Sequence, residues 1–326
     1  MSWSPRARPW LLRLGGLVLA LAGLELLLRA SVPEPDQDRQ LLWRVFGAEG
    51  YAERQRSLLG LASVDALAPL LQPDDALLWQ LRAGVSLTGE ALDPVLGRAW
   101  SVQTSPQGMR ARPLAELPEG ERRIVALGGS GTFGWGVEEE QAWPARLEES
   151  LDEGAQVLNL GVPGYTIAQS RRHLSRWAAE VQPEVVILTV GDSESRRAPR
   201  TDLRALSPGL SLPRSHTLRL ARHALAGPWA EGLLFAARLR LLESRVPVED
   251  FEREVRALAL LAPRTILVDL CAPTAWRASL AELARVRRDV EVVRYGAAHG
   301  ETIDGCLPTA PGHAALAALL ASRLYE

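Results

Sequence analysis

The stretch Arg123-Ile-Val-Ala-Leu-Gly-Gly-Ser-Gly-Thr-Phe-Gly-Trp-Gly-Val137 decides how this chain is expected to fold. A short apolar run ends in glycines, and Ser130 follows at the point where a strand must turn towards a helix. Glycine tolerates positive φ and adds no side chain, so such a turn leaves the serine hydroxyl open to a substrate. The pattern therefore predicts a nucleophilic serine at the end of a buried strand.

Two other interpretations of these glycines stay open. Gly129-Ser-Gly-Thr-Phe-Gly134 matches the dinucleotide fingerprint GxGxxG, which needs a helix to begin at once and an acid after the next strand. Here the helical pattern waits until about Trp143, and the next apolar run ends in Asn159-Leu-Gly161, so the nucleophile is favoured. The third interpretation is a glycine-rich loop that contains an incidental serine.

After Glu121, strand and helix patterns alternate along the chain. Most of the candidate strands are near-continuous runs of β-branched residues and leucine, which indicates strands buried on both faces. Alternation with helices indicates a parallel sheet between two helical layers. We therefore predict a flavodoxin-like three-layer α/β/α sandwich with a parallel five-stranded sheet over 121–326, and a helical cap inserted at 194–246. The candidate strands are 123–127, 156–160, 184–190, 265–270 and 290–294.

Composition excludes several classes of function. The chain has 326 residues and a formal net charge of −2, so it has no basic excess and we expect no nucleic-acid partner. It contains no lysine, which excludes the phosphate loop of nucleotide hydrolases, because that loop needs a lysine to reach the phosphates. The histidines and the two cysteines lack metal-ligand spacing, so we expect no metal ion and no cofactor.

Residues 1–30 have the pattern of an export signal. Three arginines precede an apolar run from Leu14 to Leu28 that only Glu25 interrupts. We predict a signal anchor or transmembrane helix, with the C-terminal domain extracytoplasmic, in the periplasm or at the cell surface. A cleaved signal and a buried helix are the alternatives. We expect residues 31–120 to form a tether and a juxtamembrane subdomain, with a helix around 51–71 and a small hairpin at 99–112.

The later candidate strands also end in residues suited to chemistry. Asn159-Leu-Gly-Val-Pro-Gly164-Tyr-Thr166 follows the second strand, and Val190-Gly-Asp-Ser-Glu194 follows the third. A last segment, Asp304-Gly-Cys-Leu-Pro-Thr-Ala-Pro-Gly-His313, leads into the final helix. Because the carboxyl ends of parallel strands share one edge of a sheet, we expect these segments to meet Ser130. The amide of Gly161 could approach a developing oxyanion closely, since no side chain blocks it.

Taken together, these segments resemble the SGNH/GDSL hydrolase family, specifically its membrane-anchored bacterial branch, over about residues 75–326. The resemblance implies that Ser130 is the nucleophile and that its amide joins Gly161 in the oxyanion hole. It also implies that Asp304 orients a catalytic histidine. Active relatives are ester hydrolases or acyltransferases, so the implied partner is an acylated carbohydrate or a lipid ester of the cell envelope.

Two positions depart from the family pattern. Ser193 stands where the family has asparagine, so its shorter side chain becomes the third expected member of the oxyanion hole. Leu307 stands where the family has histidine, and leucine cannot accept the proton of a serine. His299 and His313 are the candidate rescue bases. The alternative is a catalytically inactive protein that binds an acylated glycan or lipid, or serves as an envelope scaffold.

The other histidines and the cysteines carry weaker signals. His173, His216 and His223 lie in arginine-rich helical stretches, so we expect them on the solvated surface. Cys271 and Cys306 could form a disulfide in an oxidising compartment. Two unrelated buried thiols are the alternative interpretation.

Overall fold

The computed structural model describes eleven ranges of the chain. Its described residues belong to two compact units, one containing α1 (Arg8–Ser31) and the other containing every other helix and strand. Asp304, His299, His216 and His223 lie outside the described residues, so the expectations for them stay predictions. The described ranges are 8–31, 69–74, 76–88, 99–110, 122–152, 154–191, 193–198, 201–207, 243–296, 301–302 and 305–325.

The elements of the larger unit alternate between strands and helices from β5 onward. In chain order they are β1 (Leu71–Asp74), β2 (Leu78–Leu81), β3 (Ser86–Thr88), β4 (Ser101–Gln103), β5 (Arg122–Leu127), α4 (Ser130–Phe133), η5 (Glu139–Gln141), α5 (Trp143–Ser150), β6 (Ala155–Asn159), α6 (Ile167–Val181), β7 (Val185–Val190), β8 (Arg197–Ala198), α7 (Asp202–Leu206), β9 (Glu243–Ser244), α10 (Val248–Leu258), β10 (Arg264–Asp269), α11 (Thr274–Val286), β11 (Val290–Arg294) and α12 (Ala310–Tyr325).

Helix α1 covers most of the segment for which a membrane anchor was expected. Within the ranges that the structure describes, no helix combines the length and the apolar character that a bilayer crossing requires. The expectation of a transmembrane helix at 1–30 is therefore not supported. In this 24-residue helix Glu25 interrupts the apolar run, and Arg13 and Arg29 flank it.

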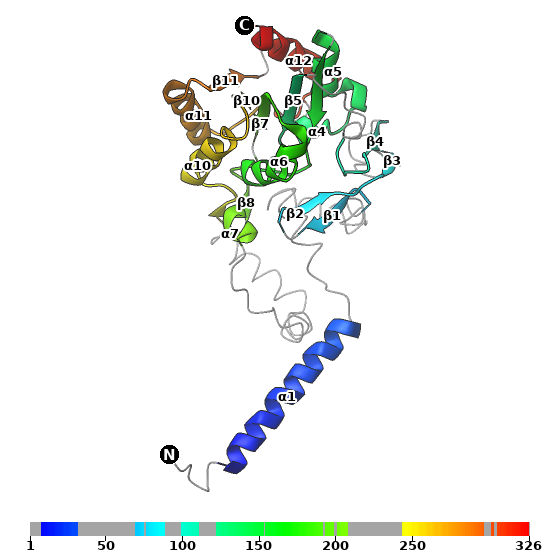
Figure 1. Ribbon diagram of the computed structural model, residues 1–326, viewed down its shortest axis with the longest axis vertical. Coiled ribbons are helices and arrows are strands. Elements are labelled where there is room, and N and C mark those ends of the chain that lie inside the picture. The colour runs from blue at the N-terminus through cyan, green and yellow to red at the C-terminus, as the bar shows by residue number, and fades with distance from the viewer. Residues whose placement is uncertain are drawn as a thin grey trace. The chain divides into compact units, whose positions relative to one another are not determined.

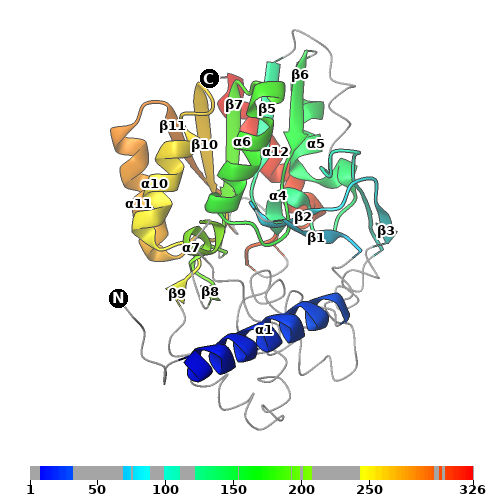
Figure 2. The same ribbon diagram turned by 60° about the horizontal axis from the view of Figure 1, so that its bottom comes forward.

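The central sheet has five parallel strands in the order β11-β10-β7-β5-β6; Figure 1 labels the strands from β11 to β5, and Figure 2 also labels β6. Numbered along the chain, this order is 2-1-3-4-5 read from the β6 edge, which is the flavodoxin-like arrangement. Every residue of β7 is buried, as expected for a strand covered on both faces. The predicted α/β fold class and its parallel five-stranded sheet are confirmed.

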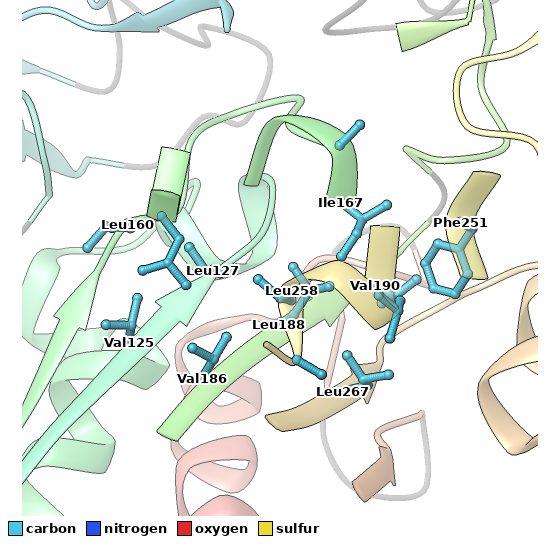
Figure 3. Packing of buried hydrophobic residues seen from close by; sticks show 14 of the residues in the cluster. Val125, Leu127, Leu160, Ile167, Val186, Leu188, Val190, Phe251, Leu258 and Leu267 are labelled. Atoms are coloured by element: carbon cyan, nitrogen blue, oxygen red, sulfur yellow. The ribbon is translucent and has the colours of Figure 1, made fainter. Parts of the chain in front are cut away.

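Two layers of helices cover the sheet (Figure 2). Val125 and Leu127 of β5 join a core with α6, α10 and α11, and Figure 3 shows this core from close by. Ile124 and Ala126 of the same strand join a second core with α5 and α12. This alternation follows from the strand geometry, in which successive side chains point to opposite faces. Because both faces are apolar, the polar residues needed for chemistry are left to the loops at the strand ends.

The subdomain before the sheet differs in part from the expectation. β1 and β2 form an antiparallel hairpin, and β4 pairs with β3 rather than within a hairpin at 99–112. The reason lies in the turn after β4, where the Gly108 amide donates to the Ser105 carbonyl at 2.9 Å and closes the chain on itself. Most of the helix expected at 51–71 lies outside the described residues.

The segment 194–246 is anchored by a buried ion pair. At its two ends β8 and β9 pair antiparallel, while residues 208–242, including most of the expected helical cap, lie outside the described residues. Arg245 and Asp202 are both fully buried, with Nη2 and Oδ2 2.7 Å apart. A buried charge is expensive unless it is paired and hydrogen-bonded, so each member depends on the other.

We expect Arg245→Met to destabilise the protein by about 3–5 kcal/mol, because it removes the buried guanidinium that pairs with the Asp202 carboxylate. The measurement is the free energy of unfolding in urea. Arg253→Met is the matched control, since Arg253 pairs with Asp250 on the exposed surface, and it should change that free energy by less than about 0.5 kcal/mol. Equal effects of the two substitutions would contradict the importance of the buried pair.

Candidate active site

The loop after β5 makes a sharp turn that presents Ser130. Gly128 has a φ of 142°, and a methyl group there would overlap Thr189 Oγ1. Ser130 begins α4, a helix of one turn that ends at Gly134 in a left-handed conformation. The serine is half-buried, and its hydroxyl makes no hydrogen bond with any residue that the structure describes. Among the described residues, therefore, none engages this hydroxyl.

The loop after β6 packs directly on this turn, backbone against backbone. A methyl group on Gly161 would lie 2.5 Å from the Phe133 amide nitrogen and 2.8 Å from the Thr132 carbonyl carbon. The Val162 amide donates to the Gly128 carbonyl at 3.0 Å. Only a residue without a side chain fits at position 161, which explains the glycine there.

The Gly161 amide, which the sequence suggested could approach an oxyanion, is hydrogen-bonded to another residue of its own loop. It donates to Asn159 Oδ1 at 3.0 Å, so in this structure it is engaged within its own loop. Gly164 lies three residues further on with a φ of 78°, and its amide makes no hydrogen bond with any described residue. Sequence reasoning passed over Gly164, although it is the other glycine of the same segment. Of these two glycine amides, only that of Gly161 is hydrogen-bonded to a described residue.

The loop after β7 also lies close to Gly129, the residue before Ser130. A methyl group on Gly129 would lie 3.6 Å from Ser193 Oγ and 3.2 Å from the Tyr165 carbonyl oxygen. The predicted segments after β5, β6 and β7 therefore meet at one edge of the sheet. Ser193 stands beside the residue that precedes Ser130, where its hydroxyl can serve as a short polar donor.

Position 307 also lies against the serine turn. A methyl group on Gly131 would lie 3.9 Å from Leu307 Cδ2, 3.8 Å from Pro308 Cδ and 2.7 Å from Leu270 Cδ1. The side chain that stands at the family's histidine position is thus close to the nucleophile turn, and it is apolar. These three residues form a hydrophobic wall next to Gly131.

A disulfide between Cys271 and Cys306 holds the late loop in place. Their Cα atoms are 5.1 Å apart, and the bond joins the end of β10 to the segment that carries Leu307. A methyl group on Gly191 would lie 3.3 Å from Cys306 Sγ and 3.5 Å from Cys271 Sγ. The disulfide therefore packs against the loop after β7 as well, and three loops are fastened together.

His313, one of the two candidate rescue bases, has a structural role. Its ring is buried, and Nδ1 accepts a hydrogen bond from the Trp143 amide at 3.1 Å, at the start of α5. Burial, aided by the nearby positive charge of Arg110, lowers its pKa to about 3. An imidazole that resists protonation so strongly is a poor acceptor for the proton of a serine.

The expectation that His173 lies on the solvated surface is wrong. Its side chain is only 4% exposed and stacks edge-on against the Tyr165 ring, with ring centroids 5.7 Å apart. Burial lowers its pKa to about 4. His173 shares the buried face of α6 with Ser170 and Leu174, at the i, i+3 and i+4 spacing of a helix packed on a core.

The β1–β2 hairpin braces the loop after β6. Trp79 Nε1 donates to the Pro163 carbonyl at 3.1 Å, and the Tyr165 hydroxyl donates to the Trp79 carbonyl at 2.6 Å. Gln169 Nε2 donates to the Leu77 carbonyl at 2.8 Å. No pattern in the sequence indicates this role, because the bonds reach backbone carbonyls more than eighty residues away.

A buried arginine braces the serine turn in the same manner. The guanidinium of Arg110 donates to the carbonyls of Phe133 at 2.7 Å, Gly134 at 2.6 Å and Val137 at 2.7 Å. The carbonyls of Phe133 and Gly134 lie at the end of α4, where helix carbonyls lack partners within the helix, and that of Val137 lies in the loop that follows. Burial lowers the pKa of Arg110 to about 10, so it remains charged at neutral pH.

The groups at this edge suit acyl chemistry. They are a serine hydroxyl, backbone amides, a second hydroxyl and an apolar wall. No group of three or more His, Cys, Asp or Glu residues within the described ranges could hold a metal ion. A hydroxyl beside amide donors can attack a carbonyl carbon while the amides stabilise the oxygen that becomes charged.

Residues 126–315, more than half of the chain, match the model of the GDSL-like Lipase/Acylhydrolase family, and the chain belongs to this family. No curated protein matches the chain.

Several solved structures are similar at low sequence identity. The crystal structure of TesA is 15% identical, with a TM-score of 0.40, covering 63% of this chain and 100% of that one. A GDSL-like lipase from Bacteroides thetaiotaomicron is 15% identical, with a TM-score of 0.39, covering 65% and 93%. A mutant of Axe2, an acetyl-xylooligosaccharide esterase from Geobacillus Stearmophilus, is 17% identical, with a TM-score of 0.33, covering 62% and 94%.

His313 should make the folded protein sensitive to acid. Its pKa is lowered from 6.5 to about 3 in the folded state, so the unfolded chain binds more protons as the pH falls through 6.5. The stability that the neutral ring contributes is present above pH 6.5 and is lost progressively below it. His313→Gln keeps an acceptor for the Trp143 amide but cannot titrate. We therefore expect its unfolding free energy to fall less steeply between about pH 7 and about pH 4.

The unfolding free energy is measured in urea for this variant and for the unaltered protein. His173 titrates in both proteins, so its effect cancels in the comparison. Parallel curves of unfolding free energy against pH would show that the His313 ring is not held neutral by the fold.

Proposed function

We propose that this protein is a serine ester hydrolase or acyltransferase that acts on lipid or carbohydrate esters of the cell envelope, with an active site weakened by Leu307. One observation carries the proposal. The half-buried Ser130 hydroxyl has no hydrogen-bond partner within the described ranges, and it stands where the loops after β5, β6 and β7 meet. A serine in such a position is suited to react rather than to stabilise the fold.

The reaction begins with attack of Ser130 Oγ on the carbonyl carbon of the ester. The hydroxyl proton passes to a base, and the carbonyl oxygen becomes an oxyanion that the amides of Ser130 and Gly164 stabilise, with the Ser193 hydroxyl as a third donor. Collapse of this intermediate breaks the bond to the alcohol, which leaves with the proton. Water, or a second alcohol in a transferase, then attacks the acyl-serine by the same route.

The identity of the base decides how fast this reaction runs. Leu307 cannot take the proton, and loss of a triad histidine costs on the order of 10⁶ in turnover elsewhere. His313 is buried and engaged with Trp143, which argues against it. His299 is therefore the remaining candidate base, with Asp304 as the acid that orients it.

A second function is favoured by the hydrophobic wall of Leu270, Leu307 and Pro308 beside Gly131. Apolar side chains next to an unreactive serine would hold the acyl chain of a glycan or lipid without cleaving its ester bond. In that case the protein is a catalytically inactive member of its family that captures an acylated ligand.

We also propose that the protein works outside the cytoplasm, with residues 1–30 acting as its export signal. The disulfide between Cys271 and Cys306 supports this location, because disulfides persist in oxidising compartments and are rare in the cytosol.

A fluorophosphonate probe separates the two functions, because it reacts with activated serines. We expect labelling at Ser130 that Ser130→Ala abolishes and that Ser175→Ala, at an exposed serine on α6, leaves unchanged. We expect Leu307→His to raise the labelling rate by about 10² or more, because it restores a base beside the nucleophile. Mass spectrometry of the labelled peptides gives the site and the rate.

The three outcomes have distinct meanings. Labelling of the unaltered chain supports the enzyme, and labelling only of Leu307→His supports the acyl-binding protein. No labelling of Ser130 in either chain would rule out a present or former nucleophile at this position.

Peptide mapping without reductant tests the location. Protein recovered from its own cells should yield one peptide pair that joins Cys271 to Cys306, because an oxidising compartment preserves the bond. Two free thiols in that material would contradict the extracytoplasmic location.

A further inference from the structure

We propose that Trp79 is a positioning residue for the oxyanion hole, because its indole N–H fixes the direction of the Gly164 amide. The inference rests on the proposed function, in which that amide stabilises the oxyanion. It assigns a role in the reaction to the β1–β2 hairpin, which lies outside the sheet and before the nucleophile in the sequence.

One hydrogen bond and the planarity of a peptide group determine the direction of the Gly164 amide. Trp79 Nε1 donates to the Pro163 carbonyl at 3.1 Å. The peptide between Pro163 and Gly164 is trans, as are all those in the described ranges. In a trans peptide the carbonyl and the following N–H point in opposite directions within one plane. The indole therefore holds the Gly164 N–H on the side of the loop that faces away from the hairpin.

The serine turn occupies that other side of the loop. The Val162 amide donates to the Gly128 carbonyl at 3.0 Å, and a methyl group on Gly129 would lie 3.2 Å from the Tyr165 carbonyl oxygen. The segment from 162 to 165 thus lies between the hairpin and the turn that begins with Ser130. An amide turned away from Trp79 is turned towards the nucleophile.

The peptide on the other side of Gly164 is held as well. Arg245 Nη1 donates to the Gly164 carbonyl at 2.6 Å, and Arg245 is itself fixed by Asp202. Gly164 has a φ of 78°, which a residue with a side chain adopts only at a cost. Trp79 and Arg245 together therefore determine the orientation of both peptide groups around this glycine.

Trp79 is rigid enough to act in this way. Its side chain is 1% exposed, and its ring lies edge-on to Tyr165 with centroids 5.8 Å apart. The Arg245 guanidinium lies over the same ring at 5.5 Å. A ring packed on both sides cannot turn its N–H away, so the donor is fixed before any substrate arrives. Preorganised donors of this kind give oxyanion holes their strength.

The test is Trp79→Phe, which keeps an aromatic ring and removes the donor. We expect the maximal rate of Ser130 phosphonylation by an alkyl fluorophosphonate to fall by about tenfold to a hundredfold, because loss of a whole donor costs on the order of 10²–10³. The probe concentration that gives half the maximal rate should stay unchanged. Substitution of a residue with only a structural role would not lower the maximal rate while leaving that probe concentration unchanged.

Trp276→Phe is the matched control, since Trp276 Nε1 donates to the Val246 carbonyl at the same distance of 3.1 Å. Both variants lose one indole hydrogen bond to a backbone carbonyl, and only Trp79→Phe should slow phosphonylation. If Trp79→Phe does not fold, a benzothienylalanine at position 79 replaces the N–H by sulfur and preserves the shape of the ring.

Equal maximal rates for Trp79→Phe and Trp276→Phe would overturn the inference and leave the proposed function intact. The comparison is made in the unaltered chain and, if that chain is unreactive, in the Leu307→His background. Absence of labelling in both backgrounds would remove the proposed function, and the role of Trp79 with it.

Discussion

The site depends on the contact between two backbones at the carboxyl edge of the sheet. Because a methyl group at Gly161 would meet the Phe133 amide nitrogen at 2.5 Å, the loops after β5 and β6 approach as closely as atoms permit. That approach brings the second loop alongside Gly128, two residues before Ser130. The geometry of the site thus follows from a steric constraint on glycines and owes little to attraction between side chains.

Loops packed this closely have no room for an apolar core of their own, and buried hydrogen bonds take its place. Arg110 binds the carbonyls that end α4, while Arg245 and Trp79 bind those around Gly164. Each donor satisfies a backbone oxygen that water cannot reach, and leaving such a group unpaired is costly. Stability and preorganisation of the site therefore come from the same bonds.

Sequence patterns predicted the sheet well, because buried parallel strands have a distinctive run of apolar residues. Each predicted strand end lies within one residue of the observed end. They also predicted that Ser130 lies at the carboxyl edge of the sheet. They failed where the signal is a hydrogen bond to a distant backbone, as for Arg245, which looks like any surface arginine in the sequence. His173 was misread for a related reason, since its arginine neighbours concealed the helical spacing of the buried face.

The hydrogen bonds that Trp79 and Arg110 donate to the loops of the site limit how far the chain can be shortened from its N-terminus. A shortened chain that starts at residue 121 would keep every strand of the central sheet. It would nevertheless lose the hydrogen bond from Trp79 to the Pro163 carbonyl and the one from Arg110 to the Phe133 carbonyl. Such a fragment could fold, but the loops after β5 and β6 would be less firmly positioned around Ser130. The hairpins before the sheet are therefore best regarded as an integral part of the machinery, encoded upstream of the region that bears the family's motifs.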